Sequence, residues 1–240
     1  MILRKIIISR AQLNVIPLDE RIFFVKVGHV LNELNTLQKV ARFSAHHTGD
    51  SIETKGRNLY ALFFVRILAG KLLEAWSALQ RDFFGAKLSK TYEAQLDNEA
   101  RQNLSKLKQY FNDRNLISQI RNNFAFHYSG SDKIAAQLEE ASKEDTFEVL
   151  LAPEHGNCLY SMSDVIVNFA LLDSIDPTDH EKALQKVLDE VFMVTRQFLD
   201  FFGECVLIIL KQYIGSDSED AKVGDAPLLD EVAIPYFVRP

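Results

Sequence analysis

Hydrophobic residues recur every three or four positions over most of this 240-residue chain, which is the spacing of helices with one buried face. The longest such segments are at about 19–45, 59–76, 88–111 and 178–213. Shorter ones are at about 133–142 and 163–172. This pattern predicts an all-α fold, a helical bundle of five or more helices.

Two regions depart from the helical pattern. Residues 1–16 are rich in Ile and Val and end before Pro17, which predicts a short strand or an extended arm. Two apolar runs, 147–151 and 158–162, flank the turn sequence Ala-Pro-Glu-His-Gly-Asn. We therefore expect a small β-hairpin insertion at about 146–162.

Composition along the chain predicts one domain followed by two short segments. Residues 1–215 form the predicted helical domain. Residues 216–226 are acidic and polar, as in a linker. Residues 227–240 regain apolar side chains such as Tyr236 and Phe237, so this C-terminal tail either docks back on the domain or binds a partner.

The segment Ile120–Tyr128 combines an apolar face with several polar side chains. Its sequence is Ile-Arg-Asn-Asn-Phe-Ala-Phe-His-Tyr. The face comprises Ile117, Ile120, Phe124 and Tyr128. Arg121, Asn123 and His127 lie off that face. Polar chemistry in a helix that otherwise looks buried marks a candidate site.

Helical geometry limits which of these side chains can meet. Arg121 and His127 are six positions apart, which on a regular α-helix separates them by roughly 120° around the axis and about 9 Å along it. Asn123 and His127 are four apart and can touch. Arg121 and His127 can serve one substrate only if the helix ends or bends near Phe126, or if a second copy supplies the missing half.

The same residues resemble a known signature. Arg121 and His127 enclose five residues, of which Asn122 is the first, in an apolar and aromatic frame that ends Phe-His-Tyr. This string of about ten residues resembles the Arg-polar-x-His motif of the HEPN superfamily. Members are small all-α proteins, and many are metal-independent endoribonucleases of toxin–antitoxin, abortive-infection and RNA-processing systems.

The resemblance implies that Arg121, Asn122 and His127 are catalytic and line a cleft made by two protomers. It therefore implies a homodimer, RNA as substrate, and an antitoxin-like protein as a further partner. In this reading His127 moves a proton, Arg121 holds the phosphate, and Asn122 positions the phosphate or the ribose. Asn123 and Tyr128 are expected to support them.

Alternatives to this reading remain open. Arg42 and His47 satisfy a looser version of the motif, but Phe43 stands where the family has a polar residue. A purely structural role would have Arg121 cap or pair with a neighbouring helix and His127 satisfied at a helix end. The protein would then be a non-catalytic HEPN-like dimeric binding or scaffold protein, whose tail recruits a partner.

The segment 59–76 is apolar nearly all round and is predicted to be the central helix of the bundle. Arg66, Gly70 and Glu74 follow one another at spacings of four and form a polar strip on it. Arg66 or Glu74 is expected to face the motif and orient its side chains, because buried charges need partners. Alternatively, Arg66 and Glu74 form an ion pair with each other or reach solvent.

Charge and motif content narrow the function classes. A net charge of −6 argues against a broad basic surface for nucleic acid, so RNA would contact a local patch or a cleft built by dimerisation. Cys158 and Cys205 are too few for a disulfide framework or a zinc site. No phosphate-binding loop, dinucleotide fingerprint or nucleophile elbow is present, so we expect no cofactor and no metal.

Apolar runs at both ends are short. The run beginning at Ile6 ends at Arg10 and is shorter than a signal-peptide core, and Cys205–Leu210 is far below the length that spans a bilayer. We therefore expect a cytoplasmic protein that does not enter the membrane.

Overall fold

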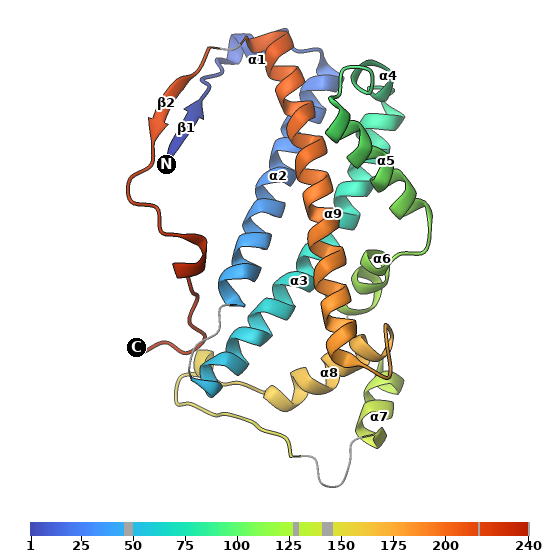
Figure 1. Ribbon diagram of the computed structural model, residues 1–240, viewed down its shortest axis with the longest axis vertical. Coiled ribbons are helices and arrows are strands. Elements are labelled where there is room, and N and C mark those ends of the chain that lie inside the picture. The colour runs from blue at the N-terminus through green and yellow to red at the C-terminus, as the bar shows by residue number, and fades with distance from the viewer. Residues whose placement is uncertain (46–49, 127–129, 141–145, 216, 240) are drawn as a thin grey trace. The chain divides into compact units, whose positions relative to one another are not determined.

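The computed structural model describes residues 1–240 except 46–49, 127–129, 141–145, 216 and 240. Three long helices dominate it: α2 (Leu18–Ser44), α3 (Ser51–Leu79) and α9 (His180–Ile209) (Figure 1). The other α-helices are α1 (Arg10–Val15), α4 (Ser89–Tyr92), α5 (Asn98–Asn112), α6 (Leu116–Ile120), α7 (Ser131–Glu140) and α8 (Ser161–Asp173). The predicted all-α fold is confirmed.

π-helical and 3₁₀ turns make up the rest of the helical structure in the described part of the chain. π-helical turns continue α3 as η1 (Gln80–Gly85), α6 as η2 (Arg121–Ala125) and α9 as η4 (Leu210–Ile214). Two 3₁₀ turns are η3 (His155–Asn157) and η5 (Leu229–Glu231). Hydrophobic spacing alone does not distinguish these turns from α-helix.

The single helix expected at 88–111 is wrong, because the chain forms two helices, α4 and α5. The Asp97 carboxylate accepts a hydrogen bond from the Ala100 backbone N–H at 2.7 Å and so caps the start of α5. An N-terminal cap with extended backbone geometry interrupts helical hydrogen bonding at this point.

Among the described residues, antiparallel pairing occurs in two places. In the region 146–162, Leu150 and Leu159 form an isolated antiparallel bridge with both backbone hydrogen bonds at 2.8 Å. The two-stranded sheet lies elsewhere, between β1 (Ile2–Lys5) and β2 (Glu219–Lys222). The hairpin predicted at 146–162 is thus reduced to one bridge, and β2 lies within the predicted linker.

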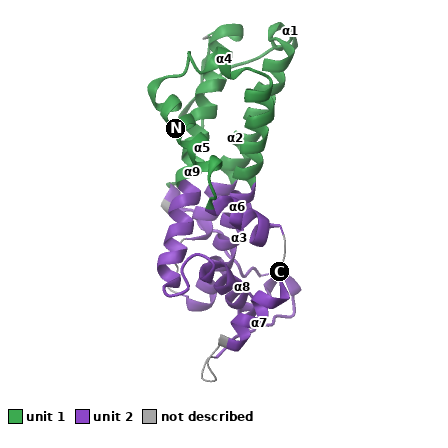
Figure 2. Ribbon diagram, turned by 90° about the vertical axis from the view of Figure 1, so that its right-hand side faces the viewer, with its two compact units in different colours: residues 1–36, 71–115, 193–228 green, residues 37–70, 116–192, 229–240 purple. Residues whose placement is uncertain are grey.

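The chain divides into two compact units (Figure 2). Unit 1 comprises residues 1–36, 71–115 and 193–228, and unit 2 comprises residues 37–70, 116–192 and 229–240. Unit 1 has an aromatic core around Phe83, whose ring centroid lies 5.2 Å from that of Phe23 and 5.6 Å from that of Phe201. In unit 2, Leu68, Ile117, Ile120 and Val191 are fully buried.

The C-terminal tail docks within unit 2. The Glu53 carboxylate on α3 accepts hydrogen bonds from the backbone N–H groups of Tyr236 at 2.7 Å and Phe237 at 3.3 Å. The Tyr236 hydroxyl donates to the Cys158 carbonyl at 2.9 Å. A Cβ on Gly56 would lie 2.3 Å from Tyr236 Cγ, so only glycine admits the ring here. No helix in the described part of the chain is long and apolar enough to cross a membrane.

Candidate functional site

The motif segment is the junction of α6 and the π turn η2. Ile117, Ile120 and Phe124 are buried and form the predicted apolar face. The helix ends at Ala125, and Phe126 is its C-terminal cap residue, with φ of −123°. The helix therefore ends near Phe126, which is one of the two alternatives that the sequence left open.

His127 and Tyr128 lie outside the described residues. The angular offset estimated for Arg121 and His127 assumed α-helical geometry, whereas Arg121–Ala125 is π-helical, with i→i+5 hydrogen bonding and a wider turn. That estimate therefore does not apply to this segment. π turns are often found at functional sites, but in this chain they also continue α3 and α9.

Asn123 has a local role in this turn. Its Nδ2 donates a hydrogen bond to the Gln119 carbonyl at 2.9 Å, four residues earlier. A side chain that takes a carbonyl from the backbone ladder competes with the regular α-helical hydrogen bond at that carbonyl. Asn123 thereby stabilises the wider turn on which Arg121 and Asn122 sit.

The structure brings Arg121 and Asn122 together. Arg121 is half-buried, and its Nη1 donates a hydrogen bond to Asn122 Oδ1 at 3.2 Å. Asn122 is exposed. The pair presents a guanidinium and an amide on one surface turn, and Asn123–Phe126 separate it from His127.

Phe126 connects this segment to α3. A Cβ on Gly70 would lie 2.3 Å from Cε2 and 2.7 Å from Cζ of Phe126, so the ring lies against the bare backbone of α3. Gly70 is one helical turn after Arg66, on the polar strip predicted from sequence. Glu74, the last member of that strip, is exposed and belongs to unit 1.

Arg66 has a charged neighbour on α8, Asp164, which the sequence pattern did not reveal. The Arg66 Nε is buried, with no hydrogen-bond partner among the described residues. Burial lowers the pKa of Arg66, and the Asp164 carboxylate opposes that shift. Burial also raises the pKa of Asp164, against the effect of Arg66. Asn168, one turn further along α8, is buried.

Part of a sequence signal for this pair existed on α8. Asp164 and Asn168 are four apart on α8 and are the polar residues of the stretch 164–172, which is otherwise apolar, so they share one face. Arg66, the partner of Asp164, lies on α3 more than ninety positions earlier, and no local pattern links these two residues.

Neighbouring elements of unit 2 hold the motif segment in place. Gln119 Nε2 donates to Ser174 Oγ at 2.8 Å, just after the end of α8. Lys133 Nζ on α7 lies 5.0 Å from the centroid of the Phe124 ring, a cation–π contact. Lys133 thus places a second positive charge close to the segment that carries Arg121.

Metal-ligating residues do not gather in the part of the chain that the structure describes: no group of three or more His, Cys, Asp or Glu side chains is placed to hold an ion. His47, of the alternative motif, lies outside the described residues. Cys158 and Cys205 are free thiols, and burial raises the pKa of Cys205.

No protein-family model matches this chain, and neither a curated protein nor a solved structure matches it.

Proposed function

We propose that this protein is a metal-independent endoribonuclease of HEPN type. The proposal rests on the hydrogen bond between Arg121 and Asn122 on a surface turn, with four residues between Asn122 and His127 in a string that resembles the HEPN signature. The same resemblance places the activity in phage defence or in a toxin–antitoxin system, with an antitoxin-like protein as partner.

The proposed reaction uses the ribose 2′-hydroxyl of RNA as the nucleophile. The 2′-oxygen loses its proton to a base, attacks the adjacent phosphorus, and displaces the 5′-oxygen of the next nucleotide. That oxygen takes up a proton and leaves as a 5′-hydroxyl, while the other product ends in a 2′,3′-cyclic phosphate. Atoms and charge balance without a co-reactant.

Three side chains would divide the work. His127 transfers the proton, a contribution of about 10²- to 10⁴-fold in rate. The Arg121 guanidinium holds two phosphate oxygens and stabilises the charge that grows on them in the transition state. The Asn122 amide, bonded to Arg121, keeps the guanidinium oriented and contacts the phosphate or the ribose.

The test is incubation of the purified protein with total RNA in the presence of EDTA, followed by analysis of the fragment ends. The proposal predicts fragments with 5′-hydroxyl and 2′,3′-cyclic phosphate ends. Fragments with 5′-phosphate ends would show that water is the nucleophile, and intact RNA would leave the chain without this activity.

The proposed cleft is completed by a second copy of the chain, as the resemblance implies. Two-fold symmetry would bring two Arg121 and two His127 side chains to one cleft. Sedimentation at micromolar concentration in mild salt is expected to give a dimer. A monomer under those conditions would contradict this part of the proposal.

A non-catalytic dimeric binding protein is the second candidate, favoured by an apolar surface in unit 1. Leu18, Ile22 and Val25 are exposed at helical spacing on α2, and Val15 of α1 is exposed just before them. Exposed apolar patches often mark interaction sites. A dimer that leaves RNA intact would favour this candidate.

A further inference from the structure

A pocket of about 330 Å³ lies in unit 1, at the lower end of the volume range of small-molecule sites. Its lining comes from the end of α3, from η1 and from the end of α5. The lining residues are Trp76, Gln80, Phe84, Lys108, Phe111 and Asn112. The pocket shares no residue with the motif.

Aromatic rings form the apolar part of the lining. Trp76 stacks on Phe111, with ring centroids 4.9 Å apart and planes 12° apart. Phe84 meets Trp76 edge-on, with centroids 6.2 Å apart. Phe84 and Phe111 are half-buried, so part of each ring remains accessible. Such a surface favours a flat aromatic ligand, since any planar base can stack on it.

Two amides supply the polar part. Gln80 and Asn112 are both exposed, and their side chains have no hydrogen-bond partner among the residues the structure describes. Each amide offers donors and an acceptor. A heteroaromatic ring with donors and acceptors on its edge can pair with them, as a nucleobase does, whereas a plain hydrocarbon ring would leave them unmatched.

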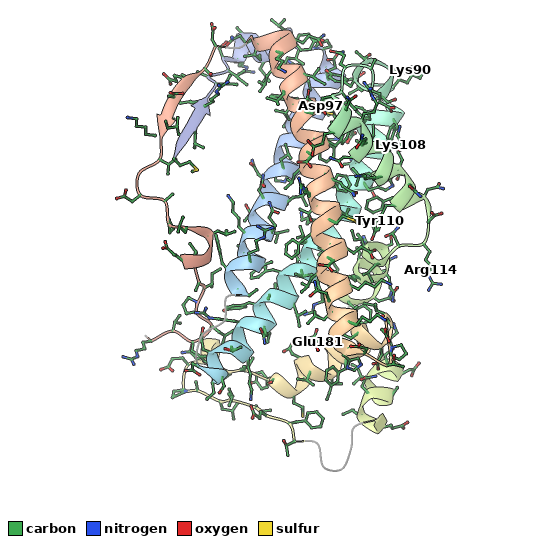
Figure 3. The ribbon with its side chains drawn as sticks, in the orientation of Figure 1. Lys90, Asp97, Lys108, Tyr110, Arg114 and Glu181 are labelled. Carbon is green, nitrogen blue, oxygen red and sulfur yellow. The ribbon has the colours of Figure 1, made fainter. Side chains whose placement is uncertain are left out.

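Lys108 gives the pocket a positive rim. Its Nζ lies 4.9 Å from the centroid of Phe84 and 2.9 Å from Glu93 Oε1. Both partners of this ion pair are substantially exposed, so the pair is weak and Lys108 can turn to an anion. Figure 3 shows Lys108, Tyr110 and Arg114 in succession along the end of α5 and into the connection that follows.

We infer that this pocket binds a nucleotide. The base lies on the rings of Phe84 and Phe111, its edge meets the amides of Gln80 and Asn112, and its phosphate lies near Lys108. The site goes beyond the proposed function, because it uses none of the motif residues and would bind a nucleotide whether or not the protein cleaves RNA.

Trp76 makes this inference directly measurable, because it is the single tryptophan of the chain. Tryptophan fluorescence, excited at a wavelength that tyrosine does not absorb, therefore reports on the lining of this pocket in the whole protein. Titration with AMP, GMP, CMP and UMP is expected to change that fluorescence saturably for at least one nucleotide, with a matching heat in calorimetry. Ribose 5-phosphate, which has no base, is expected to change neither signal.

Variants separate the base contacts from the phosphate contact. Lys108→Ala is expected to weaken nucleotide binding by roughly tenfold, because a hydrogen bond to a charged group is lost. The same change should leave the corresponding nucleoside unaffected. Asn112→Ala is expected to weaken both ligands. Lys106→Ala removes an exposed lysine from the same helix outside the pocket lining, and should bind as wild type does.

The nucleotide could be free or part of single-stranded RNA. A short oligoribonucleotide distinguishes these two sources, and 2′-O-methyl groups on it block cleavage. Tighter binding than the mononucleotide assigns the pocket to a base of single-stranded RNA, and equal or weaker binding assigns it to a free nucleotide. The inference is overturned if no nucleotide binds at millimolar concentration, or if Lys106→Ala and Lys108→Ala lose affinity equally. Either result leaves the proposed cleavage untouched, since that is measured by fragment ends.

Discussion

The motif segment of unit 2 and the aromatic pocket of unit 1 hold their polar groups in different ways. In the motif, Arg121 Nη1 donates to Asn122 Oδ1 and Asn123 Nδ2 donates to the Gln119 carbonyl, so these two donors bond to a neighbouring side chain and to the backbone. In the pocket, the Gln80 amide comes from η1 and the Asn112 amide from α5, and both lie beside the aromatic rings of the lining.

The two sites should therefore respond differently to amino-acid substitutions. The motif depends on one turn of backbone and on the glycine against which it packs, so a small change of geometry should disturb it. The pocket depends on stacked rings that already form part of the core of unit 1, so its polar side chains can be replaced without moving the scaffold.

Arg121→Lys should have the largest effect, on RNA cleavage. Lysine keeps the positive charge but lacks the planar fork that contacts two phosphate oxygens, so we expect a loss of about 10²-fold or more in kcat/KM. The measurement is the cleavage rate in EDTA. Arg114→Lys is the matched control, at an exposed arginine of unit 1, and should cleave as wild type does. Equal losses in the two variants would remove the special role of Arg121.

Gly70→Ala should disturb the motif through its backbone contact. The added methyl would lie 2.3 Å from the Phe126 ring, which must shift, and we expect a loss of about 1–3 kcal/mol in the free energy of unfolding. Denaturant unfolding measures this loss, and cleavage should fall with it, while nucleotide binding to the pocket should not change.

Gly28→Ala is the control for this substitution. A Cβ at Gly28, inside α2, meets no atom within 4 Å. There alanine should raise stability by roughly 0.5–1 kcal/mol, because it favours the helix. A similar loss of stability in both variants would show that the contact with Phe126 is not the cause.

Substitution of Glu53 should have a smaller effect. Its hydrogen bonds join α3 to the C-terminal tail, and the pocket likewise joins elements that are far apart in the sequence. Glu53→Gln keeps an acceptor but loses the charge that binds the tail and Arg57, and we expect a cost of about 1 kcal/mol. Limited proteolysis should then cut the tail faster than in wild type. An unchanged rate would show that these hydrogen bonds do not hold the tail.

The same carboxylate predicts a pH dependence. Burial raises the pKa of Glu53, but hydrogen bonds from Arg57, Tyr236 and Phe237 outweigh burial and hold the pKa below its ordinary value of 4.5. A lowered pKa in the folded state contributes stability that is fully present above the ordinary value and is lost as pH falls through the folded value. The tail should therefore become protease-sensitive in acid, and Glu53→Gln should flatten this dependence.

Sequence patterns predicted the parts of this fold that are local. The long helices follow from apolar residues at helical spacing. Arg121 and Asn122 were named through the resemblance of a short local string, but the hydrogen bond between them was not predicted. The break before α5 had a local signal too, since Asp97 is a good N-terminal cap, but the continuous apolar spacing from Leu96 to Phe111 outweighed it.

The remaining features depend on packing between distant segments. β1 pairs with β2 across more than two hundred residues, and neither strand carries a strong alternating pattern. Asp164 meets Arg66 only when α8 lies near α3. The pocket joins a tryptophan of α3 to an asparagine at the end of α5, and no spacing rule connects them. The π turns escape detection because they preserve the apolar face.

The most direct test of the central claim compares two histidine variants in one assay. RNA cleavage in EDTA is measured for wild type, for His127→Ala and for His155→Ala, an exposed histidine of the η3 turn. The proposal predicts a fall of about 10²-fold or more for His127→Ala alone, since proton transfer is lost, with unchanged circular dichroism in both variants. Equal cleavage by wild type and His127→Ala would contradict it.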